Sequence, residues 1–269
     1  MQVILGANGI IGEELAKELK ANYTTEIKLV GRNPKKVSTD NILFKGDLLH
    51  AADVCKALES AQIAYLTAGL PYSSEIWLRD WPKIMQNVIA GCIANNCKLV
   101  YFDNTYAYPQ DTKIQKEDTP LKSEGKKGKA KKIAAEILLN AIEQKEINAV
   151  ICRAPEFYGP DKTKSITNML IFEKLKENKN PKVFLKDTVL RTLIYTPDAS
   201  KALALIGNTP EVYGQTWHLP CDDNRLTYKG IIEEISKQLG STIKYDVLNC
   251  FTLKIASFFN SNIKETQEL

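Results

Sequence analysis

Three glycines spaced three residues apart, Gly6, Gly9 and Gly12, follow the short apolar segment 2–5. The segment predicts a strand, and the apolar spacing over residues 13–20 predicts a helix. A strand that passes through a glycine-rich turn into a helix N-terminus can bind a pyrophosphate, because unpaired N–H groups and the helix dipole favour an anion. We therefore expect a bound dinucleotide here, with a purely structural turn as the alternative. Further contacts in this turn are expected from Asn8, Ile10 and Ile11.

The end of the second predicted strand, residues 26–30, indicates which dinucleotide is bound. Folds that prefer NAD usually place an acidic side chain here to hold the ribose 2′-hydroxyl, but this chain continues as Gly31-Arg32-Asn33. The guanidinium of Arg32 suits a bidentate contact with a 2′-phosphate. We expect NADP, with NAD possible if Arg32 is only a solvated loop residue. Later strand ends add Asp47 and Leu48 for the adenine, and Thr67, Ala68 and Gly69 for the ribose.

Strand and helix patterns alternate through the first 155 residues. The expected strands are 2–5, 26–30, 42–44, 63–67, 98–102 and 149–153, and the expected helices are 13–20, 51–58, 81–95 and 126–144. Such alternation predicts an α/β fold of the Rossmann type, with a doubly wound parallel sheet covered by helices on both faces.

The pattern also predicts two domains. Residues 1–155 are expected to form the NAD(P)-binding Rossmann domain, and residues 156–269 a smaller, mixed, substrate-binding lobe. A helix over 197–207 is expected to return to the first domain. Within the lobe the pattern predicts helices over 166–175, 226–239 and 251–259, and extended segments over 183–185, 193–195 and 243–247.

Composition narrows the class of protein further. The 269 residues are 44% hydrophobic and 25% charged, and the net charge of +4 is too mild to indicate a nucleic-acid partner. Neither a membrane-spanning run nor a signal peptide is expected. The six cysteines lack paired metal spacing, so free thiols in a reducing cytoplasm are expected. Only two histidines are present, so no metal site is expected.

Several motifs occur in an order that resembles the short-chain dehydrogenase/reductases of the NAD-dependent epimerase/dehydratase type. They are GANGIIG at 6–12, GDL at 46–48, LTAG at 66–69, CRAPEFYGP at 152–160 and YTPDASKAL at 195–203. More narrowly, WLRDWPKIMQNVI at 77–89, YFDNTYAYP at 101–109, the Lys-Lys-Gly at 126–128 and WHLP at 217–220 resemble an atypical subgroup of NAD(P)-binding proteins. The resemblance implies that Pro155, Glu156 and Phe157 lie beside the nicotinamide, and that family members continue past position 269.

The catalytic pattern departs from the one that this resemblance implies. Classical members carry a serine or threonine after the fifth strand and a Tyr-x-x-x-Lys on the next helix, whose tyrosine moves a proton while hydride transfers. Counting from flanking landmarks places Asn104 at the serine position, Lys132 at the lysine position and Gly128 at the tyrosine position. A glycine cannot carry a proton, so Tyr106 is the expected substitute, with Asn104 as donor and Asp103 buried behind. Aromatic packing is the alternative role of Tyr106.

Two further features leave alternatives open. The lysines at 126, 127, 129, 131 and 132 form either a solvated helix face or a site for an anionic substrate such as a nucleotide-sugar. Trp77 and Trp81 either line a cleft or pack in a core or interface. The parent family also pairs through its two long helices, so a homodimer through residues 81–95 and 126–144 is expected, with a monomer as the alternative.

Two functions follow from these residues. The first is an NADP-dependent oxidoreductase or epimerase acting on a small polar or sugar-nucleotide-like substrate. The second is a catalytically silent NADP(H)-binding sensor, which the glycine at position 128 favours.

Overall fold

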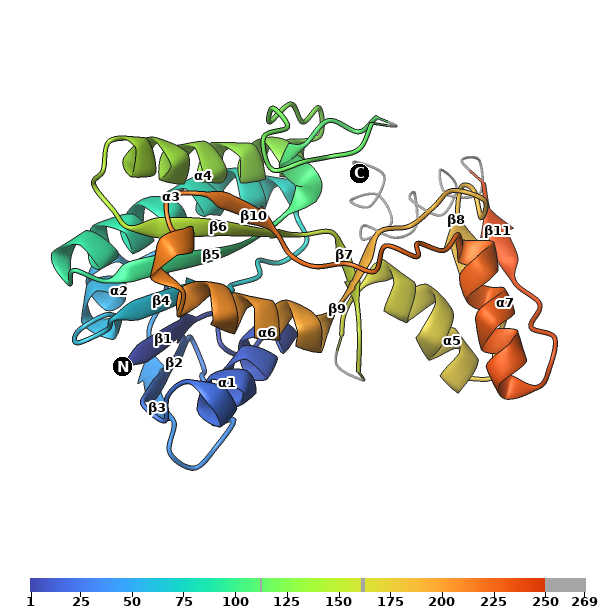
Figure 1. Cartoon of the computed structure of the whole chain (residues 1–269), viewed down its shortest axis with the longest axis horizontal. Helices are drawn as coiled ribbons and strands as arrows, with labels where there is room; N and C mark the ends of the chain where they lie inside the picture. Colours follow the sequence, from blue (N-terminus) through green and yellow to red (C-terminus); the bar gives the residue numbers. More distant parts are fainter. Residues whose placement is uncertain (112, 161–162, 250–269) are drawn as a thin grey trace. The chain divides into compact units, whose positions relative to one another are not determined.

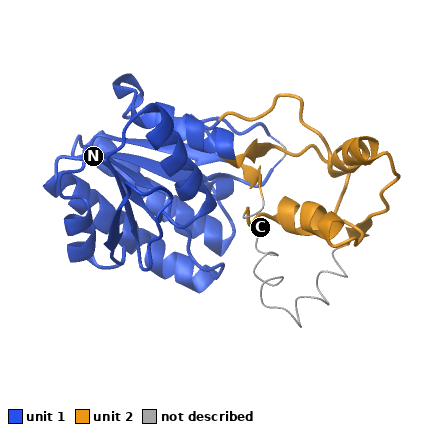
Figure 2. Ribbon diagram, turned by 90° about the horizontal axis from the view of Figure 1, so that it is seen from below, with its two compact units in different colours: residues 1–154, 197–219, 269 blue, residues 155–196, 220–268 orange. Residues whose placement is uncertain are grey.

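The computed structural model describes residues 1–111, 113–160 and 163–249. These fall into two compact units, shown in different colours in Figure 2. Unit 1 comprises residues 1–154 and 197–219, and unit 2 comprises residues 155–196 and the described part of 220–268. Each unit has its own cluster of buried apolar side chains.

Unit 1 is built on a seven-stranded parallel sheet with the order β10-β6-β5-β4-β1-β2-β3 (Figure 1). The strands are β1 (Gln2–Leu5), β2 (Ile27–Gly31), β3 (Ile42–Lys45), β4 (Ile63–Leu66), β5 (Lys98–Asn104), β6 (Ala149–Ala154) and β10 (Thr216–His218). Every residue of β1, β4 and β6 is buried, as expected for short apolar strands that helices cover on both faces. The Rossmann α/β fold predicted from the alternation is therefore confirmed.

Helices cover both faces of this sheet (Figure 1). They are α1 (Ile10–Asn22), α2 (Ala51–Ala57), α3 (Ser74–Ala94), α4 (Lys126–Glu143) and α6 (Thr196–Gly207). Figure 1 shows α1 and α6 on the face opposite α3 and α4, and the hydroxyl of Ser200 on α6 donates to the Ile11 carbonyl oxygen on α1. The burial of Ile11, Leu15 and Leu19 at a spacing of four explains how α1 packs against the sheet.

The apolar positions of α3 and α4 mostly serve the fold of this chain. The expected dimer contact rests on seven apolar positions beyond those that one sheet face needs: Ile84, Val88, Ile89, Ile93, Ile133, Ile137 and Leu138. Four of them, Ile84, Val88, Ile89 and Leu138, are buried in unit 1. Ile93 and Ile133 remain exposed, at 47% and 39%. A contact between copies through these helices would therefore have a smaller apolar surface than the sequence pattern predicts.

In its described part, unit 2 combines short strands with short helical segments. The strand pairs are β7 (Glu156–Tyr158) with β9 (Leu193–Tyr195), and β8 (Lys182–Phe184) with β11 (Asp246–Leu248). A π-helical segment over Asn168–Phe172 precedes α5 (Glu173–Lys176), and α7 (Tyr228–Leu239) follows later. Thr227 caps α7, because its hydroxyl accepts a hydrogen bond from the Gly230 N–H at 3.0 Å. Buried Ile171, Val183, Tyr228 and Ile232 form the core.

Four elements differ from the sequence pattern. Helix α3 begins at Ser74 and not near residue 81, and Pro82 lies inside it. The expected helix over 166–175 is a π-helical segment followed by a single α-helical turn. Strand β10 was not predicted; it is three residues long and gains its pairing only from β6. Strand β7 was also missed. The helix expected over 251–259 lies outside the described residues.

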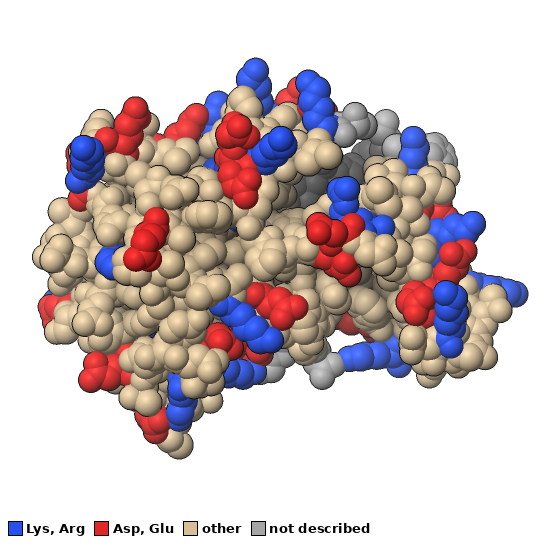
Figure 3. Space-filling model, viewed as in Figure 1, with Lys and Arg blue, Asp and Glu red and all other residues tan. Residues whose placement is uncertain are grey.

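Two surface properties complete the description. Within the described ranges, no helix is both long and apolar enough to span a bilayer. On the face drawn in Figure 3, acidic and basic side chains lie interspersed, as the net charge of +4 leads one to expect.

Candidate functional site

The glycine turn between β1 and α1 has a geometry that only glycine permits. Gly6 has a φ of +90°, and a Cβ on it would lie 2.4 Å from the Cα of Ala68. A Cβ on Gly12 would lie 2.9 Å from the Cα of Ala7, so glycine lets α1 approach β1 closely. At exposed Gly9 the nearest protein atom would be 3.7 Å from a Cβ, which leaves this peptide open to a ligand. Gly9 is also the N-cap of α1, so the first N–H groups of the helix can face an anion.

The turn lies where the winding of the sheet reverses. Strand β1 lies between β2 and β4, with β3 beyond β2 and β5 beyond β4. Open α/β sheets bind ligands outside the carboxyl ends of the strands at such a point. Thr67 follows β4 there, and its N–H and hydroxyl donate to the Leu5 carbonyl oxygen at 2.9 and 3.3 Å. The structure thus brings Thr67 and Ala68 against the glycine turn, and a Cβ on the next residue, Gly69, would meet no atom within 4 Å.

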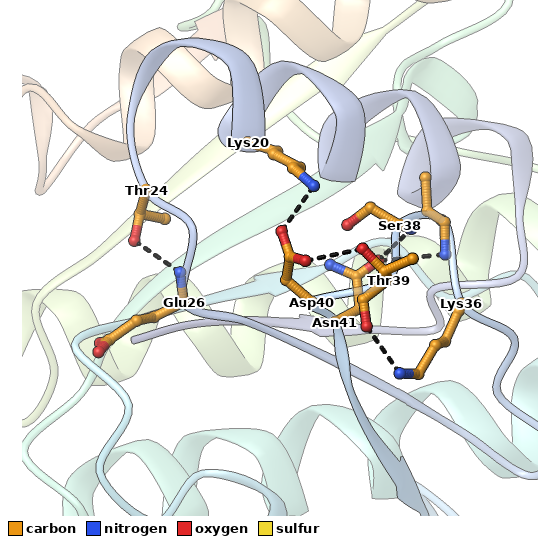
Figure 4. Close-up of polar contacts among 9 residues, drawn as sticks. Lys20, Thr24, Glu26, Lys36, Ser38, Thr39, Asp40 and Asn41 are labelled. Atoms are coloured by element: carbon orange, nitrogen blue, oxygen red, sulfur yellow. Dashed lines mark hydrogen bonds and ion pairs between the residues drawn. The ribbon is translucent and has the colours of Figure 1, made fainter.

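Arg32 opens the loop between β2 and β3, residues 32–41, which we call the β2–β3 loop. Arg32 is exposed, and its guanidinium forms no hydrogen bond or ion pair with any described residue. The far end of the loop is fastened, as Figure 4 shows: buried Asn41 accepts hydrogen bonds from the Val37 and Ser38 N–H groups at 3.1 and 2.8 Å. Asp40 also pairs with Lys20 on α1 at 2.6 Å. The C-terminal half of the β2–β3 loop is therefore held in place, and the guanidinium of Arg32 at its start can bind an anion.

Asp47 and Leu48 form a turn just after β3. The Oδ1 of Asp47 accepts from the Leu49 N–H at 3.0 Å, and the Leu48 carbonyl oxygen accepts from Nδ2 of Asn87 on α3 at 2.9 Å. The neighbouring Gly46 N–H donates to the Gly31 carbonyl oxygen at 3.0 Å. The expected adenine contacts therefore lie beside the end of β2, on the same edge of the sheet as the glycine turn.

Asn104 and Tyr106 follow β5 at this edge. The Oδ1 of Asn104 accepts from the Tyr106 N–H at 3.1 Å and so caps the short 3-10 helix Thr105–Ala107. The ring of Tyr106 stacks on that of Trp77, with centroids 6.0 Å apart and an interplanar angle of 18°. The packing expected as the alternative role of Tyr106 is therefore present, and the ring is held in a fixed orientation. Trp77 and Trp81 are both buried in the core of unit 1.

The lysines of α4 have different environments. The ammonium of Lys132, the expected ribose ligand, pairs with Glu136 on the same helix at 3.6 Å, and the side chain is 36% exposed. Lys131 is buried: its Nζ lies 2.8 Å from Oδ1 of Asp103, 2.5 Å from the Tyr101 hydroxyl and 3.8 Å from the Trp81 ring centroid. No described ion pair or hydrogen bond joins Lys132 to Asn104 or Tyr106.

The space beside Gly128 is already filled. A Cβ at this position would lie 1.6 Å from the Ser123 hydroxyl oxygen and 2.4 Å from the Tyr106 carbonyl oxygen. Gly128 is therefore required by the local packing.

The lysine cluster is not one continuous solvated face, because Lys127 is fully buried and its ammonium lies 4.1 Å from the Tyr72 ring centroid.

A buried polar network extends from Asp103 across the edge of the sheet. Oδ2 of Asp103, which is buried as expected, lies 3.3 Å from Nε of Arg153 on β6. Nη1 of Arg153 donates to the Tyr108 hydroxyl at 2.7 Å, and that hydroxyl lies 2.8 Å from Nε2 of His218 on β10. The backbone N–H of His218 donates to the Glu117 carboxylate at 3.0 Å.

Burial controls the titration of this network. Burial lowers the pKa of Lys131, and the adjacent Asp103 opposes that shift. Burial raises the pKa of Tyr101 and of Tyr108, so both phenols stay protonated. Burial also lowers the pKa of His218, while Glu117 opposes the shift. Asp103 is thus the carboxylate that compensates two buried cations, Lys131 and Arg153.

The expected nicotinamide-side residues Pro155, Glu156 and Phe157 belong to unit 2. The carboxylate of Glu156 is occupied within that unit. It accepts from the Thr167 N–H and hydroxyl, both at 2.8 Å, and pairs with Nη2 of Arg191 at 2.8 Å. The Glu156 side chain is therefore committed to contacts within unit 2.

Sequence reasoning missed most of the buried network. Lys131, Arg153 and His218 were not singled out as a group, since Asp103 and Arg153 are 50 residues apart and Tyr108 and His218 are 110 apart. The available signal was that Asp103 follows one expected apolar strand and Arg153 ends the next, and the carboxyl ends of neighbouring parallel strands meet at one edge of the sheet. Within the described residues, no group of three His, Cys, Asp or Glu side chains is arranged to hold a metal ion.

Comparisons with known proteins agree with this geometry. The sequence model described as "NAD dependent epimerase/dehydratase family" matches residues 2–218. A search of curated proteins gave no match.

Solved structures share the fold at low sequence identity. UDP-glucuronic acid 4-epimerase from Bacillus cereus, in complex with NAD, superposes with a TM-score of 0.80 at 17% identity, over 93% of this chain and 87% of that one. dTDP-glucose 4,6-dehydratase from Streptomyces venezuelae, with NAD bound, gives 0.77 at 14% identity, over 92% and 84%. UDP-N-acetylglucosamine 4-epimerase from Methanobrevibacter ruminantium M1, in complex with UDP-N-acetylmuramic acid, gives 0.78 at 17% identity, over 92% and 84%.

Proposed function

Because the chain belongs to the NAD dependent epimerase/dehydratase family, whose model matches residues 2–218, we propose that it is an NADP(H)-binding oxidoreductase or epimerase. The observation that carries this proposal is the glycine turn at the switch point of the sheet, where Gly6 and Gly12 admit no side chain and Gly9 is open. We propose a small polar, sugar-nucleotide-like substrate, since solved relatives of the fold were named for such substrates.

The residues at this edge fit a dinucleotide. Gly9 and the N–H groups of Ile10 and Ile11 would hold the pyrophosphate, and Thr67 to Gly69 would lie along a ribose. Arg32 would bind the 2′-phosphate, because its exposed guanidinium makes no described ion pair that a phosphate would have to displace. When bound, the dinucleotide supplies the hydride donor or acceptor.

The side chains for proton transfer are Tyr106 and Asn104, with Lys132 as a ribose ligand. Tyr106 is half-buried, and stacking on Trp77 holds its ring. The Nδ2 group of Asn104 can donate to a substrate oxygen while its Oδ1 still accepts the hydrogen bond from the Tyr106 N–H. In this arrangement the hydroxyl of Tyr106 gives or takes the proton as hydride moves.

The second function, a catalytically silent NADP(H) sensor, is favoured by one observation. Packing by Ser123 and the Tyr106 backbone fills the space beside Gly128, the position where the family resemblance places the proton-transferring tyrosine. Cofactor binding without turnover is consistent with that packing.

The test begins with the cofactor. Titration of the protein with NADPH and NADH should show tighter binding of NADPH, and Arg32→Asp should reverse the order. Loss of a charge-assisted phosphate contact is worth about 1.5–3 kcal/mol, roughly ten- to more than a hundredfold in affinity. Equal affinities in the parent protein would contradict the role of Arg32.

Turnover decides between enzyme and sensor. The parent protein is incubated with NADPH or NADP and a panel of UDP- and dTDP-sugars, with absorbance at the nicotinamide band and product analysis by NMR as readouts. Conversion of any member supports the enzyme. Tight NADPH binding with no conversion across the panel favours the sensor.

A homodimer through α3 and α4 belongs to the same proposal. Its apolar contact would rest on Ile93 and Ile133, at the exposed positions of the two helices. Light scattering at micromolar concentration should give about twice the chain mass of 30.2 kDa, and a single-chain mass would contradict the dimer.

A further inference from the structure

Asn8, in the glycine turn, uses its side chain on the protein itself. Its Nδ2 donates to the Asn33 carbonyl oxygen at 2.7 Å, and its Oδ1 accepts from the Lys35 N–H at 3.1 Å. Both polar ends of one carboxamide therefore bind the backbone of the β2–β3 loop, 25 and 27 residues further along the chain. This bridge joins the pyrophosphate turn to the loop that begins with Arg32.

The bridge fixes the part of the loop that carries its exposed cations. Arg32 directly precedes the bound Asn33 carbonyl, and Lys35 supplies the bound N–H group. The side chains of Arg32 and Lys35 are exposed and form no hydrogen bond or ion pair with another residue in the described part of the chain. Without a partner for their charges, only the backbone can hold them in place.

The two ends of the β2–β3 loop are held by different groups. In its C-terminal half, Asn41 bonds to the backbone of the loop itself, and the Asp40–Lys20 pair joins the loop to α1 (Figure 4). Its N-terminal half, which carries Arg32, is bonded to the glycine turn through Asn8. Loss of the Asn8 carboxamide would therefore free the cationic half of the loop and leave the other half in place.

We propose that Asn8 is a positioning residue for cofactor specificity: it holds the backbone of residues 33–35 so that Arg32 and Lys35 together face the 2′-phosphate of NADP. This inference rests on the proposed preference for NADP. Asparagine suits the role because it donates and accepts at once, whereas aspartate accepts only and alanine does neither. Asn8 acts through the two cations, so its effect appears only with ligands that carry the 2′-phosphate.

The experiment measures dissociation constants for NADPH, NADH, 2′-phospho-AMP and AMP by calorimetry. Asn8→Ala should weaken NADPH and 2′-phospho-AMP about three- to tenfold, the effect expected from the loss of one or two hydrogen bonds. The dissociation constant for NADH divided by that for NADPH should fall toward one, and Asn8→Asp should lower this ratio further by adding a negative charge. The matched control is Asn22→Ala on α1, whose exposed carboxamide donates to Glu18 at 2.7 Å, and it should leave the ratio unchanged.

A double-mutant cycle separates positioning from general damage. On an Arg32→Ala background, Asn8→Ala should have a much smaller effect on NADPH than it has in the parent protein, because the two residues act on one contact. Thermal unfolding of each variant verifies the fold, and Asn8→Ser provides a milder change if the alanine variant is unstable.

The outcomes distinguish this inference from the proposed function. If Arg32→Ala removes the preference for NADPH but Asn8→Ala keeps it, or if Asn8→Ala weakens NADPH and NADH equally, the inference is wrong and the proposed NADP site stands. If the parent protein shows no preference for NADPH, both are wrong.

Discussion

Asp103→Asn should be among the most destabilising single substitutions in unit 1, because it leaves two buried cations without a counter-charge. The carboxylate lies 2.8 Å from Nζ of Lys131 and 3.3 Å from Nε of Arg153, and all three side chains are at most 3% exposed. Removing one partner of a buried ion pair typically costs about 3–5 kcal/mol. For a chain of this size, that corresponds to a fall in Tm of roughly 10 °C.

The assay is urea and thermal unfolding of the parent protein and four variants, monitored by circular dichroism. Lys131→Met should lower the free energy of unfolding less, by about 1–2 kcal/mol. Asp103 still pairs with Arg153 in this variant, and the thioether can replace the ammonium over the Trp81 ring. Adding Lys131→Met to Asp103→Asn should recover part of the loss, since it removes one of the unpaired cations. Asp40→Asn is the control, because the Asp40–Lys20 pair is exposed and should contribute little.

The order of the variants is the critical result. If Asp103→Asn lowers the free energy of unfolding by less than about 1 kcal/mol, the charge of Asp103 is not needed and the argument from buried charge fails. If Lys131→Met is as damaging as Asp103→Asn, the loss reflects packing around α4 and not uncompensated charge.

Three further predictions concern the same edge of the sheet. Tyr106→Phe should keep the fold and the stacking on Trp77 while turnover on a verified substrate falls by about 10²- to 10⁴-fold; unchanged turnover would contradict the assignment. Gly128→Ala should destabilise by about 1–3 kcal/mol in thermal unfolding, because its Cβ would lie 2.4 Å from a backbone oxygen, and a tyrosine there should not restore activity. Because burial lowers the pKa of His218 below its ordinary 6.5, the unfolded chain takes up the proton first, so stability should fall as pH drops below about 6.5. His218→Gln should flatten that pH dependence of the free energy of unfolding, and a slope unchanged by the substitution would contradict it.

Much of the fold could be predicted because its signals are local. The three glycines each match a backbone requirement at their own position: the positive φ of Gly6, the openness of Gly9 and the close approach at Gly12. Runs of three to five residues predicted six strands of the sheet with their order along the chain, and connection rules then gave the Rossmann winding. Strand β10 was missed because Thr216, Trp217 and His218 do not form an apolar run, and only pairing with β6 makes them a strand.

The placement of the lysines was decided by tertiary packing. Counting along the helix gives Lys132 a role, but neighbouring helical residues point about 100° apart, so a one-residue difference separates a buried ammonium from an exposed one. The structure buries Lys131 against Asp103 and leaves Lys132 with Glu136. The glycine at position 128 is likewise visible in the sequence, but the packing of Ser123 against it is not.

The sequence by itself determined the nucleotide-binding turn, the alternation of strands and helices and the absence of a tyrosine at position 128, because each depends on residues close together in the chain. The tertiary structure decided the network of Asp103, Arg153 and His218 and the bridge from Asn8 to the β2–β3 loop. Their members are 25 to 110 residues apart. Parallel strands bring such residues to one edge of a sheet, and a linear pattern does not record which side chains meet there.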